Sequence, residues 1–256
     1  MKLGWKKDPH NPKDFKFEQL KPRLTVVSTS DEHIINERAP IFDQGRLSSC
    51  VANATCGALE ILLGLSDSAE PPRLSRLFIY WNARVYTKET NLDEGTYIRD
   101  AFDSLRTLGV CLESTWKYNS GMVFAQPNLN SYREGDDNTI TAFYRIGSSG
   151  SQRVDDIESA IRSDHPVVFG TNVSKEFQGY SGGNKVWDPP SSSIGGHAMV
   201  ITGVRINSSG EREFLVRNSW GTNWGDNGRC WFSEKYIKWD ETNDIWVPTL
   251  VPVLTI

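Results

Sequence analysis

Three residue types in this chain have the chemistry and the spacing of a nucleophilic site, and the first is a cysteine. Cys50 stands at the predicted start of a helix, because "SSCVANATCGALEILLG" places apolar residues at helical spacing after two serines that can cap it. A helix N-terminus carries partial positive charge and free N–H groups, which stabilise a thiolate and lower the thiol pKa. The alternative for Cys50 is a small buried residue, and helix position alone does not exclude it.

A histidine and an asparagine supply what such a thiolate needs. His197 opens the apolar run "HAMVITGVRI" directly after the small residues "SSSIGG", which allow a substrate chain to pass close to the backbone. Asn218 ends the next predicted strand, inside "VRNSWGTNWGDNGRCWF". An imidazole can hold the cysteine as a thiolate, and an asparagine oxygen can accept from the imidazole N–H and orient the ring. The remaining histidines are expected to be structural: His10, His33 and His165.

Gln44 and Trp220 complete the candidate site. The side-chain amide of Gln44 and the backbone N–H of Cys50 are predicted to form an oxyanion hole, in which each donor lowers the barrier by ~3 kcal/mol. Trp220 is expected to cover the hydrogen bond between His197 and Asn218 and to keep water away from it. The alternatives are an exposed loop glutamine and, for "NSWG" alone, a simple β-turn.

Together, "DQGRLSSC", "GGHAMVITGV" and "RNSWGTNWGDNG" resemble the papain family of cysteine peptidases, over about residues 36–236. The segment around the cysteine looks most similar to the bacterial branch of that family. The resemblance implies hydrolysis of peptide bonds through a thioester acyl-enzyme on Cys50. It assigns His197 as base and acid and Asn218 as orienter, and it implies no cofactor and no metal.

The same resemblance suggests where a substrate binds. Gly95 corresponds to the family's substrate loop, although Glu94 stands where a second glycine is usual. Gly196, directly before His197, is expected to leave an open pocket wall, and Trp220 is placed with these two glycines in the substrate-binding set. The predicted partner is therefore a peptide or protein substrate. A non-catalytic peptide-binding module and a peptide ligase on the same fold remain the alternatives.

The cysteines depart from the family signature C-G-[SA]-C-[WY], because Leu47, Ser48 and Val51 replace its first cysteine, its glycine and its aromatic residue. The disulfide formed by that first cysteine in secreted relatives is therefore not expected. The four cysteines form no CxxC pair, so a zinc site is not expected either. The three others are predicted to be buried reduced thiols: Cys56, Cys111 and Cys230.

The composition limits the possible partners, and the order of the predicted elements indicates the fold class. The 256 residues carry a net charge of -4, which argues against nucleic acid or an anionic membrane as a partner. No signal peptide is visible, so a cytoplasmic location is expected, with secretion by another route left open. Helices are predicted at 48–64, 75–86, 96–109 and 154–163, and strands at 166–173, 197–206, 212–220, 228–237 and 245–256. Helices followed by strands indicate an α+β protein.

The expected architecture is the papain-like two-lobe fold, with the active cleft between a helical lobe and an antiparallel β lobe. Residues 29–256 form the peptidase domain, divided into the helical lobe at about 29–130 and the β lobe at about 131–256. Residues 1–28 form an N-terminal arm. This arm either wraps the back of the lobes, which is favoured, or lies in the cleft as a short inhibitory segment.

Overall fold

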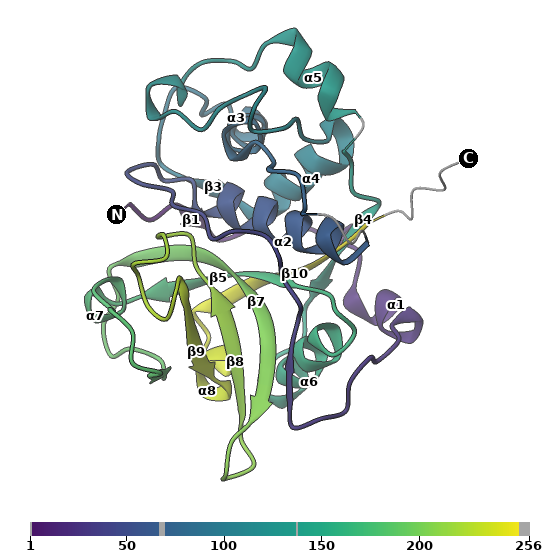
Figure 1. The fold of residues 1–256 in the computed structure, drawn as a ribbon, viewed down its shortest axis with the longest axis vertical. Helices are drawn as coiled ribbons and strands as arrows, with labels where there is room; N and C mark the ends of the chain where they lie inside the picture. The colour runs from purple at the N-terminus through teal and green to yellow at the C-terminus, as the bar shows by residue number, and fades with distance from the viewer. Residues whose placement is uncertain (1, 67–69, 137, 251–256) are drawn as a thin grey trace.

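The computed structural model describes residues 2–66, 70–136 and 138–250, and it confirms the predicted α+β class. Helices from the first half of the chain lie above a mostly antiparallel sheet formed by the second half (Figure 1). Within the described ranges, none of the helices has the length and apolar character needed to span a membrane.

The four predicted helices are confirmed, with shifted ends. The helices and 3-10 turns are α1 (Phe17–Leu20), η1 (Lys21–Arg23), α2 (Cys50–Ser66), α3 (Arg76–Thr87), α4 (Ile98–Leu108), η2 (Ser120–Met122), α5 (Leu129–Gly135), α6 (Gly150–Ile161), α7 (Lys175–Gln178) and α8 (Glu234–Lys238). Helix α2 runs past Gly64, its predicted end, to Ser66, and Gly64 is buried where a Cβ would lie 3.4 Å from the Pro71 ring. Ser75 caps α3 by accepting a hydrogen bond from the Phe78 N–H.

The strands are β1 (Trp5–Lys6), β2 (Glu32–Ile34), β3 (Thr96–Tyr97), β4 (Ala142–Ile146), β5 (Val167–Val173), β6 (Val186–Trp187), β7 (Gly195–Ile206), β8 (Arg212–Arg217), β9 (Arg229–Ser233) and β10 (Thr242–Thr249). The main sheet has the order β4-β10-β5-β7-β8-β9-β6, with β2 also paired to β7. One predicted strand, 228–237, is wrong in its second half, because Ser233 ends β9 and caps α8. The end of the predicted strand 245–256 lies outside the described residues.

Helix α2 joins the two layers. It packs against α3 and α4 on one side and against β7 on the other. The first hydrophobic core therefore contains sheet residues such as Ala198 and Trp246 among the helical ones. This packing fixes the start of α2 relative to the start of β7, which are the two elements that carry Cys50 and His197.

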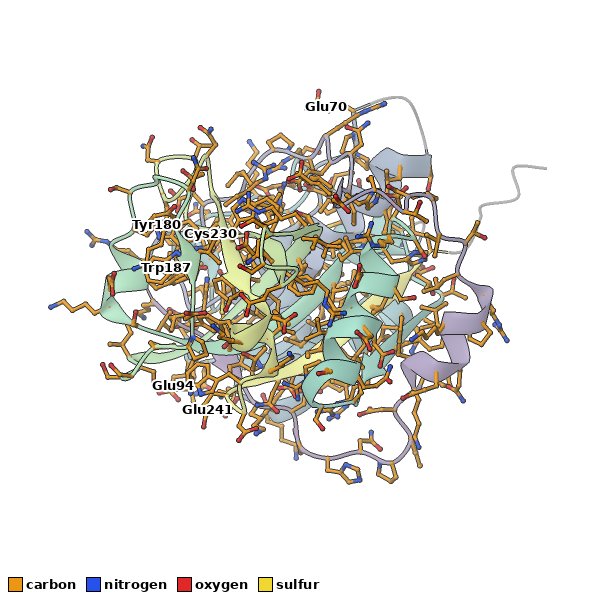
Figure 2. All side chains as sticks on the ribbon, turned by 90° about the horizontal axis from the view of Figure 1, so that it is seen from below. Glu70, Glu94, Tyr180, Trp187, Cys230 and Glu241 are labelled. Carbon is orange, nitrogen blue, oxygen red and sulfur yellow. The ribbon has the colours of Figure 1, made fainter. Side chains whose placement is uncertain are left out.

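A second core lies within the sheet layer and ends in a cluster of aromatic rings. Phe177 of α7 contacts the rings of Trp187, Trp220 and Trp224 at centroid distances of 5.1, 5.8 and 5.0 Å. Tyr180 lies beside Trp187, at 5.3 Å between centroids, as Figure 2 shows. These contacts place Trp220 in a rigid setting behind the candidate site.

The N-terminal arm has two parts. Its first strand, β1, pairs in parallel with β3 and runs between the helical layer and the sheet (Figure 1). Its second part, α1 with η1, packs against β4 and α6, where Lys21 forms an ion pair of 2.7 Å with Asp156. The intervening residues 9–13 are exposed or half-buried at the surface.

Candidate active site

Cys50 is the first residue of α2, as the sequence predicts, and its side chain is fully buried. The backbone N–H groups of Ala198 and Gly4 lie against its sulfur. Ala198 follows His197 in β7, so the thiol and the imidazole belong to elements that face each other. Gly4 belongs to the N-terminal arm, so the arm reaches the sulfur itself.

The structure brings His197 and Asn218 together. His197 Nε2 lies 2.7 Å from Asn218 Oδ1, so Nε2–H donates to the amide oxygen and Nδ1 is the nitrogen left for the thiol. Trp220 stacks on the imidazole, with ring centroids 4.4 Å apart, and shields this hydrogen bond from water. Over the described part of the chain, His197 Nδ1 has no hydrogen-bond partner.

Gln44 is held so that one of its amide hydrogens faces the site. Its Nε2 donates to Leu47 O at 2.9 Å, and its Oε1 accepts from Ser219 Oγ at 2.8 Å. The second amide hydrogen donates to the backbone oxygen of Lys2 at 3.1 Å. Gln44 therefore already binds a peptide carbonyl, and that carbonyl belongs to the arm.

Residues 2–8 of the arm cover the site. The Gly4 carbonyl accepts from the Thr96 N–H at 2.9 Å, which begins the parallel pairing of β1 with β3. Gly95 has a φ of +87°, and a Cβ there would lie 1.9 Å from Gly4 O, so only glycine allows this approach. The arm thus lies in the site as an extended peptide.

Burial shifts the pKa values of Cys50 and His197 away from their ordinary values. It raises the pKa of the Cys50 thiol to about 11, although the nearby N–H groups of Ala198 and Gly4 act to lower it. Burial also lowers the pKa of His197 to about 4, against the opposing effect of its bond to Asn218. The lowered thiol pKa expected from the helix start is therefore not present in this form, because burial outweighs the nearby N–H groups.

The three predicted substrate-binding residues have different surroundings. Gly95 and Gly196 both contact the arm, since a Cβ on Gly196 would lie 2.6 Å from the Trp5 ring. Trp220 is 4% exposed and stacks on the His197 ring, a position that suits it to orient the imidazole.

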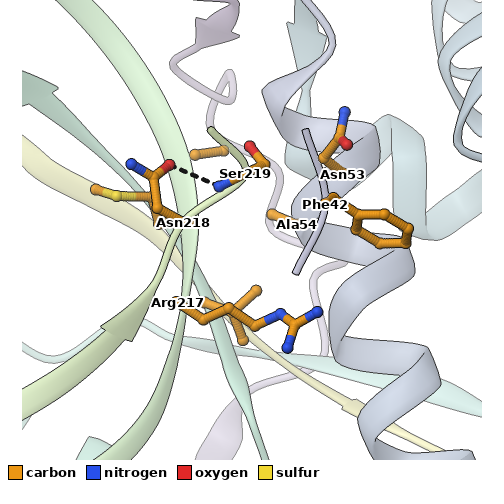
Figure 3. Close-up of a pocket in the computed structure, with 9 residues that line it drawn as sticks. Phe42, Asn53, Ala54, Arg217, Asn218 and Ser219 are labelled. Carbon is orange, nitrogen blue, oxygen red and sulfur yellow. Dashed lines mark hydrogen bonds between the residues drawn. The ribbon is translucent and has the colours of Figure 1, made fainter. Parts of the chain in front are cut away.

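A small cavity of about 10 Å³ lies on the inner side of the site (Figure 3). Its walls come from α2, β7, β8 and neighbouring loops, and the labelled ones are Phe42, Asn53, Ala54, Arg217, Asn218 and Ser219. This volume suits about one water molecule, so the cavity is too small for a substrate side chain. Nowhere in residues 2–66, 70–136 or 138–250 do three or more His, Cys, Asp or Glu side chains form a group suited to a metal ion. Cys56, Cys111 and Cys230 are buried and free, as predicted.

The sequence did not predict which residues of the arm contact the site, or which residues of the body contact the arm. Trp5, Asp8 and Asp244 carry no motif, and they meet only in the folded chain. Gly170 did carry a signal, because an isolated glycine inside a strand pattern indicates close approach of another group. Trp5 is that group, as a Cβ on Gly170 would lie 2.0 Å from its ring.

The comparisons with known proteins agree with this geometry. The family model "Papain family cysteine protease" matches residues 30–243. The chain is 33% identical over 216 residues to "Uncharacterized peptidase C1-like protein L477" of Acanthamoeba polyphaga mimivirus, covering 80% of this chain and 68% of that protein. It is 39% identical over 217 residues to cathepsin L1 of Drosophila melanogaster, covering 80% of this chain and about half, 53%, of that relative.

A solved structure is similar over nearly the whole chain. Xylellain, a cysteine protease from Xylella fastidiosa, superposes with a TM-score of 0.82 at 27% identity, over 97% of this chain and 96% of that one. The family model covers most of the chain, and the fold is that of papain-like proteins. The chain therefore belongs to the papain family of cysteine proteases, which are hydrolases.

Proposed function

We propose that this protein hydrolyses peptide bonds through a thioester acyl-enzyme on Cys50. The observation that carries the proposal is that an extended peptide, the arm, already lies in the site. Its Lys2 carbonyl accepts from Gln44 and its Gly4 N–H faces the Cys50 sulfur. A substrate bound along the same face places its carbonyl where Gln44 and the Cys50 N–H stabilise the oxyanion.

The roles of the other residues follow from the geometry. His197 Nδ1 takes the thiol proton, gives it to the leaving amine and then activates water for deacylation. Asn218 fixes the ring by accepting from Nε2–H, and it remains neutral, so the imidazolium is held without a buried anion beside it. The amine leaves with the proton that His197 took from the thiol. Water then supplies the hydroxyl group of the released acid, and its other proton returns through His197 to the sulfur.

We further propose that residues 2–8 keep the enzyme latent. They bury the nucleophile, occupy one oxyanion donor and pair with β3. The Gly4 N–H faces the sulfur from this segment, so residues 2–8 occupy the position that a substrate would need.

The test is labelling with an epoxysuccinyl peptide electrophile at about pH 6, followed by location of the adduct by mass spectrometry. An ordinary thiol with a pKa near ~8.5 is almost wholly protonated there and reacts slowly. We expect slow labelling of Cys50 in the unaltered chain and rapid labelling in Trp5→Ala, which removes the arm's largest contact. Phe15→Ala is the matched control, because Phe15 lies in the same arm but is 47% exposed and outside the site.

Hydrolysis of fluorogenic peptides by the Trp5→Ala chain should fall by at least about 10³-fold in Cys50→Ala and by a similar factor in His197→Ala. Cys56→Ala, six residues farther along α2, should retain most activity. Equal labelling of several cysteines, or turnover that survives Cys50→Ala, would contradict the proposed mechanism. Equal labelling rates with and without Trp5 would contradict latency alone.

A further inference from the structure

The side chain of Trp5 fills a slot whose floor is made of two glycines on neighbouring strands. A Cβ on Gly170 of β5 would lie 2.0 Å from the Trp5 ring, and a Cβ on Gly196 of β7 would lie 2.6 Å from it. Both distances are far below any tolerated contact, so every other residue type at either position would expel the indole. The sheet therefore has a recess of the width of an aromatic ring at this point.

The slot has a polar end, which is the carboxylate of Asp244. Asp244 is 2% exposed, and its two oxygens have different partners. Oδ1 accepts from Arg145 Nη2 of β4 at 2.9 Å. Oδ2 accepts from Trp5 Nε1 at 3.0 Å and from the Asp8 backbone N–H at 2.7 Å. Both donors to Oδ2 thus come from the arm, whereas the donor to Oδ1 belongs to the body of the protein.

The slot lies next to the catalytic residues. Gly196 directly precedes His197, and Trp5 directly follows Gly4, whose N–H faces the Cys50 sulfur. The Gly4 carbonyl is bound by Thr96, so a peptide backbone at this edge points a side chain into the slot. When the arm leaves, the slot becomes part of the substrate site and Asp244 Oδ2 loses both of its donors.

We propose that Gly170, Gly196 and Asp244 form a subsite that selects an indole side chain, that of tryptophan, on the substrate. The proposal rests on the peptidase function proposed above. An indole fits the glycine floor and returns an N–H donor to Asp244 Oδ2. A phenylalanine or leucine side chain leaves that buried oxygen without a donor, which is the arrangement by which sites reject analogues that lack a hydrogen-bonding group.

A cationic side chain is not favoured by the charges around the slot. Arg145 already pairs with Asp244, and Arg99 lies near the same carboxylate. Asp14 bonds to both arginines and lies outside residues 2–8, so displacement of that segment does not remove it. Arg99 and Arg145 then face Asp14 and Asp244, and these charges balance, so arginine or lysine of a substrate meets no net negative charge at the slot.

The test uses the full-length Trp5→Ala chain, which removes the indole from the slot, with a positional-scanning library of fluorogenic peptides. At one position on the acyl side of the cleaved bond, kcat/KM should favour tryptophan over phenylalanine by at least about tenfold, and arginine should rank below tryptophan. Asp244→Asn should bring the ratio of tryptophan to phenylalanine close to one. Arg145 holds the amide oxygen in that variant and turns the NH2 group toward the indole N–H. Asparagine also tolerates the φ of +50° at this position.

Gly170→Ala should shift the preference at that position to small side chains, whereas Gly147→Ala should not, since a Cβ on Gly147 meets nothing within 4 Å. Turnover with no tryptophan preference at any acyl-side position would overturn the subsite and leave the peptidase function standing. Binding of N-acetyl-tryptophanamide and N-acetyl-phenylalaninamide to the same chain, followed by NMR, needs no turnover. Tighter binding of the former in a chain that cleaves nothing would support the subsite and contradict the peptidase function, and equal binding would overturn the subsite.

Discussion

At the scale of single residues, Gln44 is the proposed side-chain donor to the oxyanion. Its amide is fixed on both sides by Leu47 O and Ser219 Oγ, so it loses no freedom when it donates to a substrate carbonyl. Preorganised donors of this kind contribute more to the transition state than to substrate binding. The amide hydrogen that does not bond to Leu47 O donates to Lys2 O, so its direction and reach suit the proposed donation to an oxyanion.

Gln44→Ala should therefore lower kcat by about 10²–10³-fold with a much smaller change in KM. The measurement is steady-state hydrolysis of a fluorogenic peptide, made in the Trp5→Ala chain so that the loss of the Lys2 contact does not enter. Gln126→Ala, at an exposed position, serves as the control and should leave both constants unchanged. A large rise in KM at constant kcat would show that Gln44 binds the ground state instead.

The sequence was most informative at this scale. Residue type, motif and order name Cys50, His197 and Asn218 as candidates, and the structure places the last two in contact. The ionisation of the site could not be foreseen, because it depends on burial by residues 2–8, far away in the sequence. A motif reports the residues that do chemistry but not the solvent that surrounds them.

At the scale of elements, the loop that leads to Gln44 is held by one buried arginine of β8. Arg217 is 3% exposed and donates to Glu37 at 2.8 Å, to Ala39 O at 2.8 Å and to Pro40 O. Glu37 is also contacted by Arg229 of β9, which is more exposed. The two arginines thus make a matched pair, one buried and one near the surface.

Arg217→Met should lower the free energy of unfolding by about 3–5 kcal/mol, since it leaves the buried Glu37 carboxylate with Arg229 alone and removes the donor to the Ala39 carbonyl. Arg229→Met should cost about 1 kcal/mol or less, because water can reach that side of the pair. Chemical denaturation of both variants measures the difference. Equal losses would show that burial does not decide the strength of these contacts.

Elements with strong periodic patterns were predicted well, and weakly patterned ones were not. Helices α2, α3 and α4 carry long apolar faces and clear end signals, and they were found within a few residues. The short α5 and the strand β4 were missed, because seven polar-rich residues and five residues beside a loop give too little pattern. Helix α8 was taken for strand, since its five residues follow a true strand without a break in apolar character.

At the scale of the whole molecule, the arm is attached through a pair of buried carboxyl groups. Asp8 lies beside Asp244, and burial and this neighbour raise its pKa from 3.8 to about 7, against Trp246, which donates to it, and Arg99. Asp244 accepts from Trp5, Asp8 and Arg145, so it keeps the negative charge and Asp8 takes the proton. Asp14, which bonds to Arg99 and Arg145, completes the charged groups at this contact.

A carboxyl whose pKa is higher with the arm docked than with it released takes up a proton on docking. The contribution of Asp8 to docking is therefore fully present below about pH 4 and is lost as the pH rises to about 7. His197, whose pKa is lowered from 6.5 to about 4 by burial, opposes docking below pH 6.5, so the effect of Asp8 is seen alone above that pH. The activity of the full chain relative to Trp5→Ala should thus increase from pH 6.5 to pH 8. Asp8→Asn, which is neutral at every pH, should remain latent at pH 8, and Asp31→Asn, at an exposed position, should behave like the unaltered chain. A constant ratio across this range would contradict the assignment.

The exposed connection between residues 8 and 17 has a consequence for the kinetics of activation. Because the arm is tethered, its effective concentration at the cleft is of the order of millimolar and does not change when the protein is diluted. One backbone cut in the connection turns residues 2–8 into a separate peptide while α1 stays packed on the β lobe. Occupancy then depends on concentration, so the cut peptide dissociates on dilution. A population that makes such cuts in neighbouring copies would activate autocatalytically, with a lag that shortens as the protein concentration rises.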